Sequence, residues 1–228
     1  MNNRAVIEPQ GTQSDAAYAA LHRDILSGRL APGAKIVIGE VALKYGFSPG
    51  AVREALSRLS AEWMAVATAQ KGYSVADVSA SELLDLTNTR IAIEQMCLRA
   101  AIERGDIEWE SAIVAAYHRL HRIPMAAADD SRRLNPDWTA AHSAFHAALA
   151  DGCGSAWMLT VRAMLYAQAE RYRNLSKALA PEVRDVDSEH KAIMDACLSR
   201  AADSAGRLIE AHLNTTARIV LAALDAAG

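Results

Sequence analysis

Residues 45–62 read YGFSPGAVREALSRLSAE, and this stretch decides the fold of the first third of the chain. Gly46 stands where a left-handed residue would end one helix, and Ser48 followed by Pro49 is a start signal for the next. The apolar residues after that start recur at i, i+4 and i+7, as on a buried helix face: Val52, Leu56 and Leu59. The stretch therefore predicts a helix over about 49–62, joined to a preceding helix by a tight turn.

The segments on either side complete a small domain. A first helix is predicted from about Ser14, as its N-cap, to Ser27, and a short helix over 39–45. Two β-prone runs, 64–68 and 73–75, flank Gln70-Lys71-Gly72 and predict a β-hairpin with a glycine at its tip. Helix, short helix, turn, helix and hairpin is the order of a winged helix-turn-helix, which we predict over residues 14–79.

A domain of this kind inserts the start of its third helix into the major groove, while the wing touches the DNA backbone or the minor groove. Arg53 lies off the apolar face near that start, where it can reach a phosphate or a guanine edge. Residues 1–79 carry eight Lys/Arg against seven Asp/Glu, and the remainder carries sixteen against twenty. A small surface module with solvated arginines is the alternative. The predicted DNA contacts are Ser48, Gly50, Arg53, Arg58, Lys71 and Gly72.

The rest of the chain, residues 80–228, is predicted to be an all-α bundle of about six helices, which makes the protein mostly α. The expected helices span 80–104, 107–124, 135–151, 154–178, 185–200 and 202–226. No apolar run approaches about 18 residues, so no membrane span is predicted. The N-terminus lacks the apolar region of a signal peptide, and the three cysteines have no CxxC spacing. Both features favour a cytoplasmic protein with reduced thiols.

Four histidines in the second half of the chain lie beside apolar stripes. His142 and His146 are four residues apart on one helix face, in HSAFH, and His190 and His212 lie in two later helices. A buried imidazole without a partner is costly, and one shared metal would satisfy several at once. Four separate histidines, each with its own partner, are the alternative. The HExxH pattern of metalloproteases is absent, because Ser143 stands where its general-base Glu would be.

The segments ILSGRLAPGAKI, YGFSPGAVREALSRLSAE and QKGYSV resemble parts of the GntR-type winged-helix regulators. The resemblance covers about residues 14–79 and implies that the domain binds an operator in double-stranded DNA. Pro49 and Gly39 stand where many or some members carry DNA-contacting arginines, which implies a different or weaker operator. Trp63 replaces the usual glycine after the recognition helix. If that position is left-handed here too, Trp costs on the order of 1 kcal/mol relative to Gly.

Residues 80–226 resemble the FCD domain of the FadR-like branch of these regulators. The resemblance implies effector-binding roles for Arg90 and Glu94, in TNTRIAIEQM. It also implies that these residues hold a metal: His146, His190 and His212. His142 stands where the family usually has Asp, which implies either a fourth imidazole ligand or a pocket residue. Imidazoles suit Zn²⁺, Ni²⁺ or Cu²⁺ better than Mn²⁺, and we expect zinc or nickel.

The segment AERYRNLS places two arginines between these histidines. Arg173 is expected to face the bundle interior and clamp a carboxylate in bidentate fashion. The alternative is that Arg171 and Arg173 are solvated, with at most one facing inward. The segments ERYR, HSAFH and RDVDSEH are similar to the carbon-starvation regulator subgroup, whose effectors are small dicarboxylates. The expected partner of the second domain is therefore a small carboxylate effector.

These features predict a ligand-responsive transcription regulator that acts as a repressor and not as an enzyme. We expect a homodimer, because twofold proteins match the twofold symmetry of near-palindromic operators. Two alternatives stay open. In the first, the protein is a metal-ion sensor and the metal is itself the signal. In the second, it is a metal-dependent enzyme, which would need a general base beside an open metal position.

Overall fold

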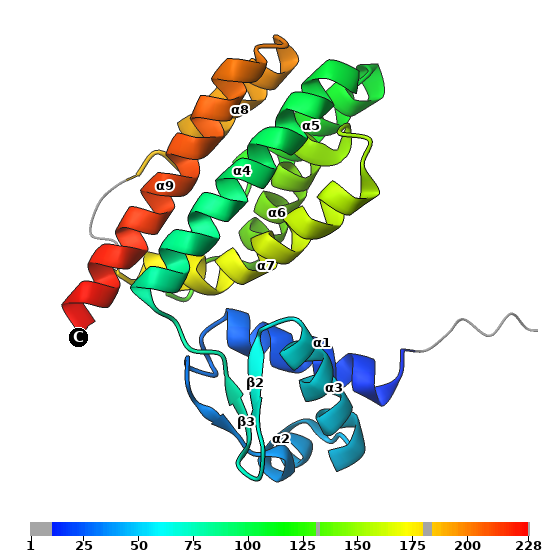
Figure 1. Ribbon diagram of the computed structural model, residues 1–228, viewed down its shortest axis with the longest axis vertical. Helices are drawn as coiled ribbons and strands as arrows, with labels where there is room; N and C mark the ends of the chain where they lie inside the picture. Colours follow the sequence, from blue (N-terminus) through cyan, green and yellow to red (C-terminus); the bar gives the residue numbers. More distant parts are fainter. Residues whose placement is uncertain (1–10, 131–132, 180–183, 228) are drawn as a thin grey trace, which may run out of the picture. The chain divides into compact units, whose positions relative to one another are not determined.

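The computed structural model describes residues 11–130, 133–179 and 184–227 (Figure 1). Their contacts divide the chain into two compact units, and the division falls between Asp77 and Val78. The chain is mostly helical, with a small sheet in the first unit and a helical second unit, which confirms the predicted fold class. Within the described residues, no helix combines the length and the apolar character that a membrane crossing requires.

The first unit is a winged helix-turn-helix. Its elements are α1 (Gln13–Leu26), β1 (Lys35–Ile36), α2 (Ile38–Tyr45), α3 (Pro49–Ala61), β2 (Ala65–Thr68) and β3 (Gly72–Val75). The strands form an antiparallel sheet in the order β1-β3-β2, and Ser74 in the central strand lies opposite both Lys35 and Val66. The β2–β3 hairpin is the predicted wing.

The turn between α2 and α3 forms for the reasons that the sequence indicates. Gly46 adopts a left-handed conformation with φ of 71°, and it ends α2. Ser48 caps α3, because its side chain accepts a hydrogen bond from the Ala51 amide at 3.2 Å. The apolar stripe of α3 is fully buried: Val52, Leu56 and Leu59.

The structure differs from the prediction at two places in this unit. The N-cap of α1 is Thr12 and not Ser14, because Thr12 and Asp15 form a reciprocal capping box that satisfies two backbone amides. Strand β1 was not expected, since a strand of two residues is too short to show an alternating pattern. It forms because Lys35 and Ile36 pair with β3.

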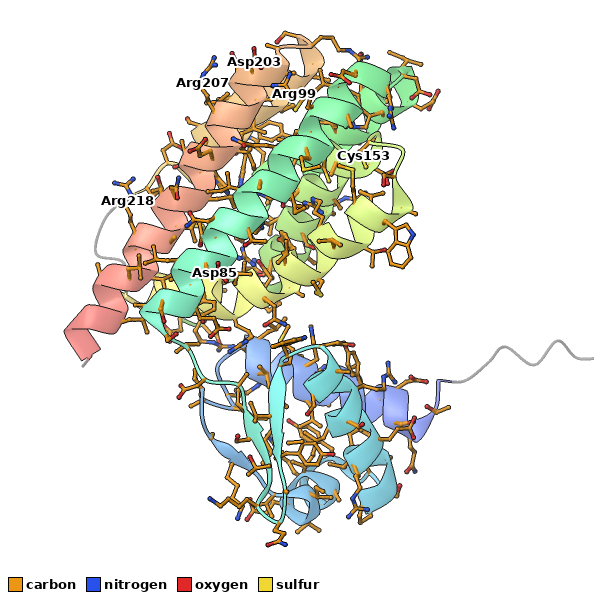
Figure 2. All side chains as sticks on the ribbon, viewed as in Figure 1. Asp85, Arg99, Cys153, Asp203, Arg207 and Arg218 are labelled. Carbon is orange, nitrogen blue, oxygen red and sulfur yellow. The ribbon has the colours of Figure 1, made fainter. Side chains whose placement is uncertain are left out.

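The second unit is an α-helical bundle. Its helices are α4 (Ala80–Arg104), α5 (Ile107–His121), α6 (Pro136–Asp151), α7 (Ala156–Leu179), α8 (Val186–Leu198) and α9 (Ala202–Ala227). Figure 1 shows α4 and α9 running side by side along the bundle. Arg99 of α4 and Asp203 of α9, both labelled in Figure 2, join these helices with an ion pair of 2.6 Å.

The end of α5 differs from the prediction. The helix was expected to reach residue 124 but ends at His121, with Arg122 as its C-cap. Pro124 explains the difference, because it has no amide hydrogen and it disfavours the helical conformation in Ile123. The core beneath α5 is built from several helices, and Phe145 of α6, Ile193 of α8 and Ile209 of α9 are fully buried in it. The same three helices carry the four histidines of the predicted metal site.

Candidate metal centre and DNA-binding helix

The four histidines come together in the interior of the bundle. His142 and His146 project from α6, His190 from α8 and His212 from α9, and each side chain is at least 95% buried. Each offers one ring nitrogen to a set in which all four atoms lie within 4.8 Å of one another. In a tetrahedral zinc site, with Zn–N distances of about 2.1 Å, the nitrogens lie about 3.4 Å apart, so modest ring rotations would complete the set.

Two of the histidines are oriented by partners outside the cluster. Nδ1 of His142 lies 2.9 Å from the Tyr166 hydroxyl, and Nδ1 of His212 lies 2.7 Å from Oε2 of Glu189. These contacts leave Nε2 of both rings for the cluster. Histidines that bind metals commonly use one nitrogen in this way while the other bonds to a carboxylate or hydroxyl.

The other two histidines have unsatisfied nitrogens. Within the described part of the chain, neither ring nitrogen of His146 has a hydrogen-bond partner, and neither does Nε2 of His190. A buried polar atom without a partner costs about 1–3 kcal/mol, so three such atoms in one cluster need an explanation. A metal ion that accepts nitrogen ligands would satisfy one atom of each ring.

The cluster is electrically neutral before any ligand binds. Burial lowers the pKa of His142, His146 and His212 below the ordinary value of 6.5, and neighbouring arginines lower it further, although Glu189 opposes the shift at His212. Burial likewise lowers the pKa of His190 to about 2. Neutral imidazole is the form that coordinates metals, so the site needs no deprotonation step near neutral pH.

Buried arginines and glutamates surround the histidines. Glu94, predicted as an effector residue, accepts hydrogen bonds from Arg162 at 2.7 Å and from Arg90 at 3.4 Å. The Arg90 guanidinium also lies over the Tyr166 ring, 4.7 Å from its centroid. Arg162 donates a further bond of 2.6 Å to the carbonyl of His146. Arg90 is therefore held beside the cluster by the Glu94 side chain and by an aromatic face.

Sequence reasoning missed Arg162 as a member of this site. The signal was present, because polar residues recur at i, i+4, i+8 and i+11 along α7: Arg162, Tyr166, Glu170 and Arg173. All four side chains are largely buried. A helix face of this kind carries no apolar stripe, so apolar periodicity alone does not reveal it.

The two arginines of ERYR are both largely buried rather than solvated, and they have different neighbours. Arg173 pairs with Glu170, and its guanidinium lies 5.3 Å from the centroid of the Trp138 ring. Arg171 donates to Gln168 at 2.8 Å and packs near the Tyr172 ring. Of the two, Arg173 lies close enough to His142 to depress its pKa.

The predicted DNA contacts of the first unit fall into two groups. Arg53 and Gly50 are exposed on the first turns of α3, and Lys71 and Gly72 are exposed at the tip of the wing. Arg58 already has partners within the unit, because its guanidinium pairs with Asp15 at 2.8 Å and lies over the Tyr18 ring. The exposed set can meet DNA directly, whereas Arg58 would have to share or leave an existing partner.

Trp63, directly after α3, has a left-handed backbone with φ of 62°. Its side chain is 73% exposed, so packing offsets little of the strain of this conformation.

An exposed recognition helix with a glycine-tipped wing, on a chain that also buries a four-histidine cluster in an α-bundle, defines a DNA-binding transcription regulator.

Comparisons with known proteins identify the family. Residues 13–75 match the family described as bacterial regulatory proteins, gntR family, and residues 85–215 match the FCD domain. The HTH-type transcriptional regulator BphR of Paraburkholderia xenovorans is 37% identical over 206 residues, which cover 90% of this chain and 84% of that protein. The HTH-type transcriptional repressor GlaR of Escherichia coli is 36% identical over 211 residues, covering 91% and 95%.

The solved structure of E. coli McbR/YncC has the same fold, with a TM-score of 0.74 at 16% identity over 92% of this chain and 98% of that one. The chain therefore belongs to the gntR family of bacterial regulatory proteins and carries an FCD domain. It is a transcription regulator and not an enzyme, and the relatives named above are transcription regulators too.

Proposed function

We propose that this regulator holds one divalent metal ion in its FCD domain, with His146, His190, His212 and His142 as ligands. The observation that carries the proposal is the buried set of four imidazoles whose ligand atoms lie within 4.8 Å, with three ring nitrogens that lack partners in the described chain. Four nitrogen donors favour zinc or nickel over manganese. A bound ion of this kind would supply a Lewis-acidic centre on which an anion can dock.

We further propose that a carboxylate effector docks beside this metal. Four guanidiniums lie around the cluster, those of Arg90, Arg162, Arg173 and Arg184. They pair with three carboxylates, those of Glu94, Glu170 and Glu189, so these guanidiniums outnumber their direct carboxylate partners by one. With four neutral ligands the metal keeps its own charge as well, which makes an anion the natural remaining ligand. In this proposal Arg90 and Arg173 contact the carboxylate, and Glu94 positions Arg90.

The first unit, residues 14–79 in our prediction, is proposed to bind an operator through Ser48, Gly50, Arg53, Lys71 and Gly72, with a lesser part for Arg58. We propose that the protein acts as a homodimeric repressor in the cytoplasm, where bacterial DNA lies. The relative GlaR, which is named a repressor, supports the direction of regulation. Membership of the carbon-starvation regulator subgroup stays a prediction.

Metal analysis of protein purified without a nickel column tests the first proposal. We expect about one equivalent of metal per chain. The double variant His146→Ala/His190→Ala should lose it, whereas His118→Ala, an exposed histidine of α5, should retain it. Full metal content in the double variant would refute the site.

Operator titration then separates the effector model from the metal-sensor model. The effector model expects that metal-loaded protein binds DNA and that a carboxylate changes the affinity by about 5- to 150-fold, the usual range of two-site coupling. If adding and removing the metal alone produces this change, the metal is the signal. If Arg90→Ala leaves a carboxylate response intact, the proposed docking role of Arg90 is wrong.

A further inference from the structure

A pocket of about 320 Å³ lies beside the four-histidine cluster. Two of its lining residues connect it to the proposed metal site. His190 belongs to the cluster itself, and the Trp138 ring stacks on the His142 ring with centroids 4.8 Å apart. A molecule in this pocket would therefore contact His190, one of the four proposed ligands, and the ring that stacks on His142.

Much of the pocket wall is apolar. The wall comes from the end of α5, the connection after it and the first turns of α6 and α8, through these side chains: Leu120, Ile123, Met125, Trp138 and Val186. Ligand pockets commonly measure about 300–1,000 Å³ and are lined mainly by apolar side chains, so this pocket lies at the lower end of that range. A small dicarboxylate would leave this wall in contact with water, whereas a ring-sized apolar group would cover it.

The charged groups of the wall do not suit a second carboxylate. Asp185 and Asp187 both line the pocket. Arg184 lines it too, but each of its guanidinium nitrogens already donates to another group, to Glu189, to Thr216 or to the carbonyl of His212. The His121 imidazole is held by Asp187 at 2.9 Å. A second carboxylate here would meet two acidic side chains.

We propose that this pocket takes the body of the effector, and that the effector is a monocarboxylate carrying a ring-sized apolar group in preference to a small dicarboxylate. The inference rests on the proposed function, because the single carboxylate is taken up by the metal and the buried arginines. It replaces the dicarboxylate class that the subgroup resemblance implies, since the walls of this chain's own pocket select against it.

Calorimetric titration of the full-length zinc-loaded protein tests the ligand class. The probes are benzoate, phenylacetate and 3-phenylpropionate against succinate, glutarate and adipate, with 3-phenylpropionamide as the uncharged counterpart. We expect the best aryl acid to bind at least about tenfold more tightly than any diacid, since tenfold corresponds to about 1.4 kcal/mol, less than the burial of one large apolar side chain contributes.

Three outcomes would count against the inference in distinguishable ways. Equal or tighter binding of a diacid overturns the ligand class and leaves the metal-carboxylate proposal standing. Binding of the amide as tightly as the acid overturns carboxylate docking, and with it the effector half of the proposed function. If none of the acids binds while zinc is retained, both the ligand class and the effector half of the proposed function are wrong.

Two variants test the pocket itself. Ile123→Trp fills it and should abolish aryl-acid binding while zinc content and the melting temperature stay unchanged. Asp187→Asn removes an acidic wall residue and should raise glutarate affinity about two- to fivefold, the size of a partly exposed charge interaction. Asp195→Asn, on the same helix but paired with Lys191 and absent from the pocket lining, is the matched control and should change nothing. If glutarate responds equally to both Asp variants, the wall does not set the selectivity.

Discussion

Replacement of Glu189 by Gln should weaken zinc binding although Glu189 is not one of the proposed ligands. Its Oε2 lies 2.7 Å from Nδ1 of His212, and it also accepts hydrogen bonds from Arg184. Burial alone would raise the pKa of the Glu189 carboxyl, but the hydrogen bonds from His212 and Arg184 hold it at about 2. The group is therefore charged near neutral pH. It fixes the hydrogen of His212 on Nδ1 and leaves Nε2 free to coordinate.

Carboxylates in this position typically contribute 10- to 100-fold to metal affinity, or about 1.4–2.7 kcal/mol. Glu189→Gln keeps the shape and one oxygen acceptor, so its loss should fall near the lower end of that range. Glu189→Ala, which removes the acceptor, should fall near the upper end. A competition titration against a chromophoric zinc indicator at fixed pH measures both values.

Glu103→Gln, an exposed carboxylate of α4, is the matched control and should bind zinc as the parent protein does. Circular dichroism must show that the Glu189 variants keep their helices. If Glu189→Ala binds zinc within about twofold of the control, the carboxylate does not orient His212, and the assignment of Nε2 to the metal loses its support.

Three further outcomes are expected. Arg53→Ala should weaken operator binding by about 1–3 kcal/mol if the guanidinium reads a base, and fluorescence anisotropy at fixed salt that shows no change would contradict the contact. Trp63→Gly should raise the free energy of unfolding by about 1 kcal/mol, because glycine adopts the left-handed conformation without strain and the indole, at 73% exposed, packs little. Urea denaturation measures the change, and destabilisation would mean that the indole has a packing role. Metal-stripped protein should lose stability as the pH falls below 6.5. In that range the histidines bind protons in the unfolded chain but not in the folded chain, where their pKa values are lowered. This difference lowers the free energy of unfolding by about 1.4 kcal/mol per pH unit for each histidine. A flat stability profile between pH 7 and 5 would contradict the burial of the cluster.

The parts of the fold that could be predicted are those set by local signals. Gly46 and Ser48 end one helix and start the next through their own backbone and side-chain chemistry, so neighbouring residues suffice to place the turn. Strand β1 depends on pairing with β3, almost forty residues later in the chain, and its two residues carry no pattern of their own. The choice of Thr12 over Ser14 as N-cap depended on Asp15, three residues after Thr12.

The candidate site divides in the same way. The histidines could be singled out because an i, i+4 pair and two apolar-flanked imidazoles are visible along the chain. The groups that orient them could not, since Tyr166 meets His142 across 24 residues and Arg162 meets Glu94 across 68. Such contacts depend on how the helices pack. A single sequence reveals this packing only where a pattern of polar residues indicates it.

His142, which stands where the resemblance implies an Asp, connects these observations. His142 is well held, because Tyr166 bonds its Nδ1 and Trp138 stacks on its ring. A carboxylate at this position would cancel one charge of a divalent metal, whereas the neutral imidazole cancels none. In the proposed site the missing negative charge is supplied by the effector, so metal and effector each stabilise the binding of the other. Linkage requires this coupling to be reciprocal. If the metal raises the affinity for the acid by some factor, the bound acid must raise the affinity for the metal by the same factor.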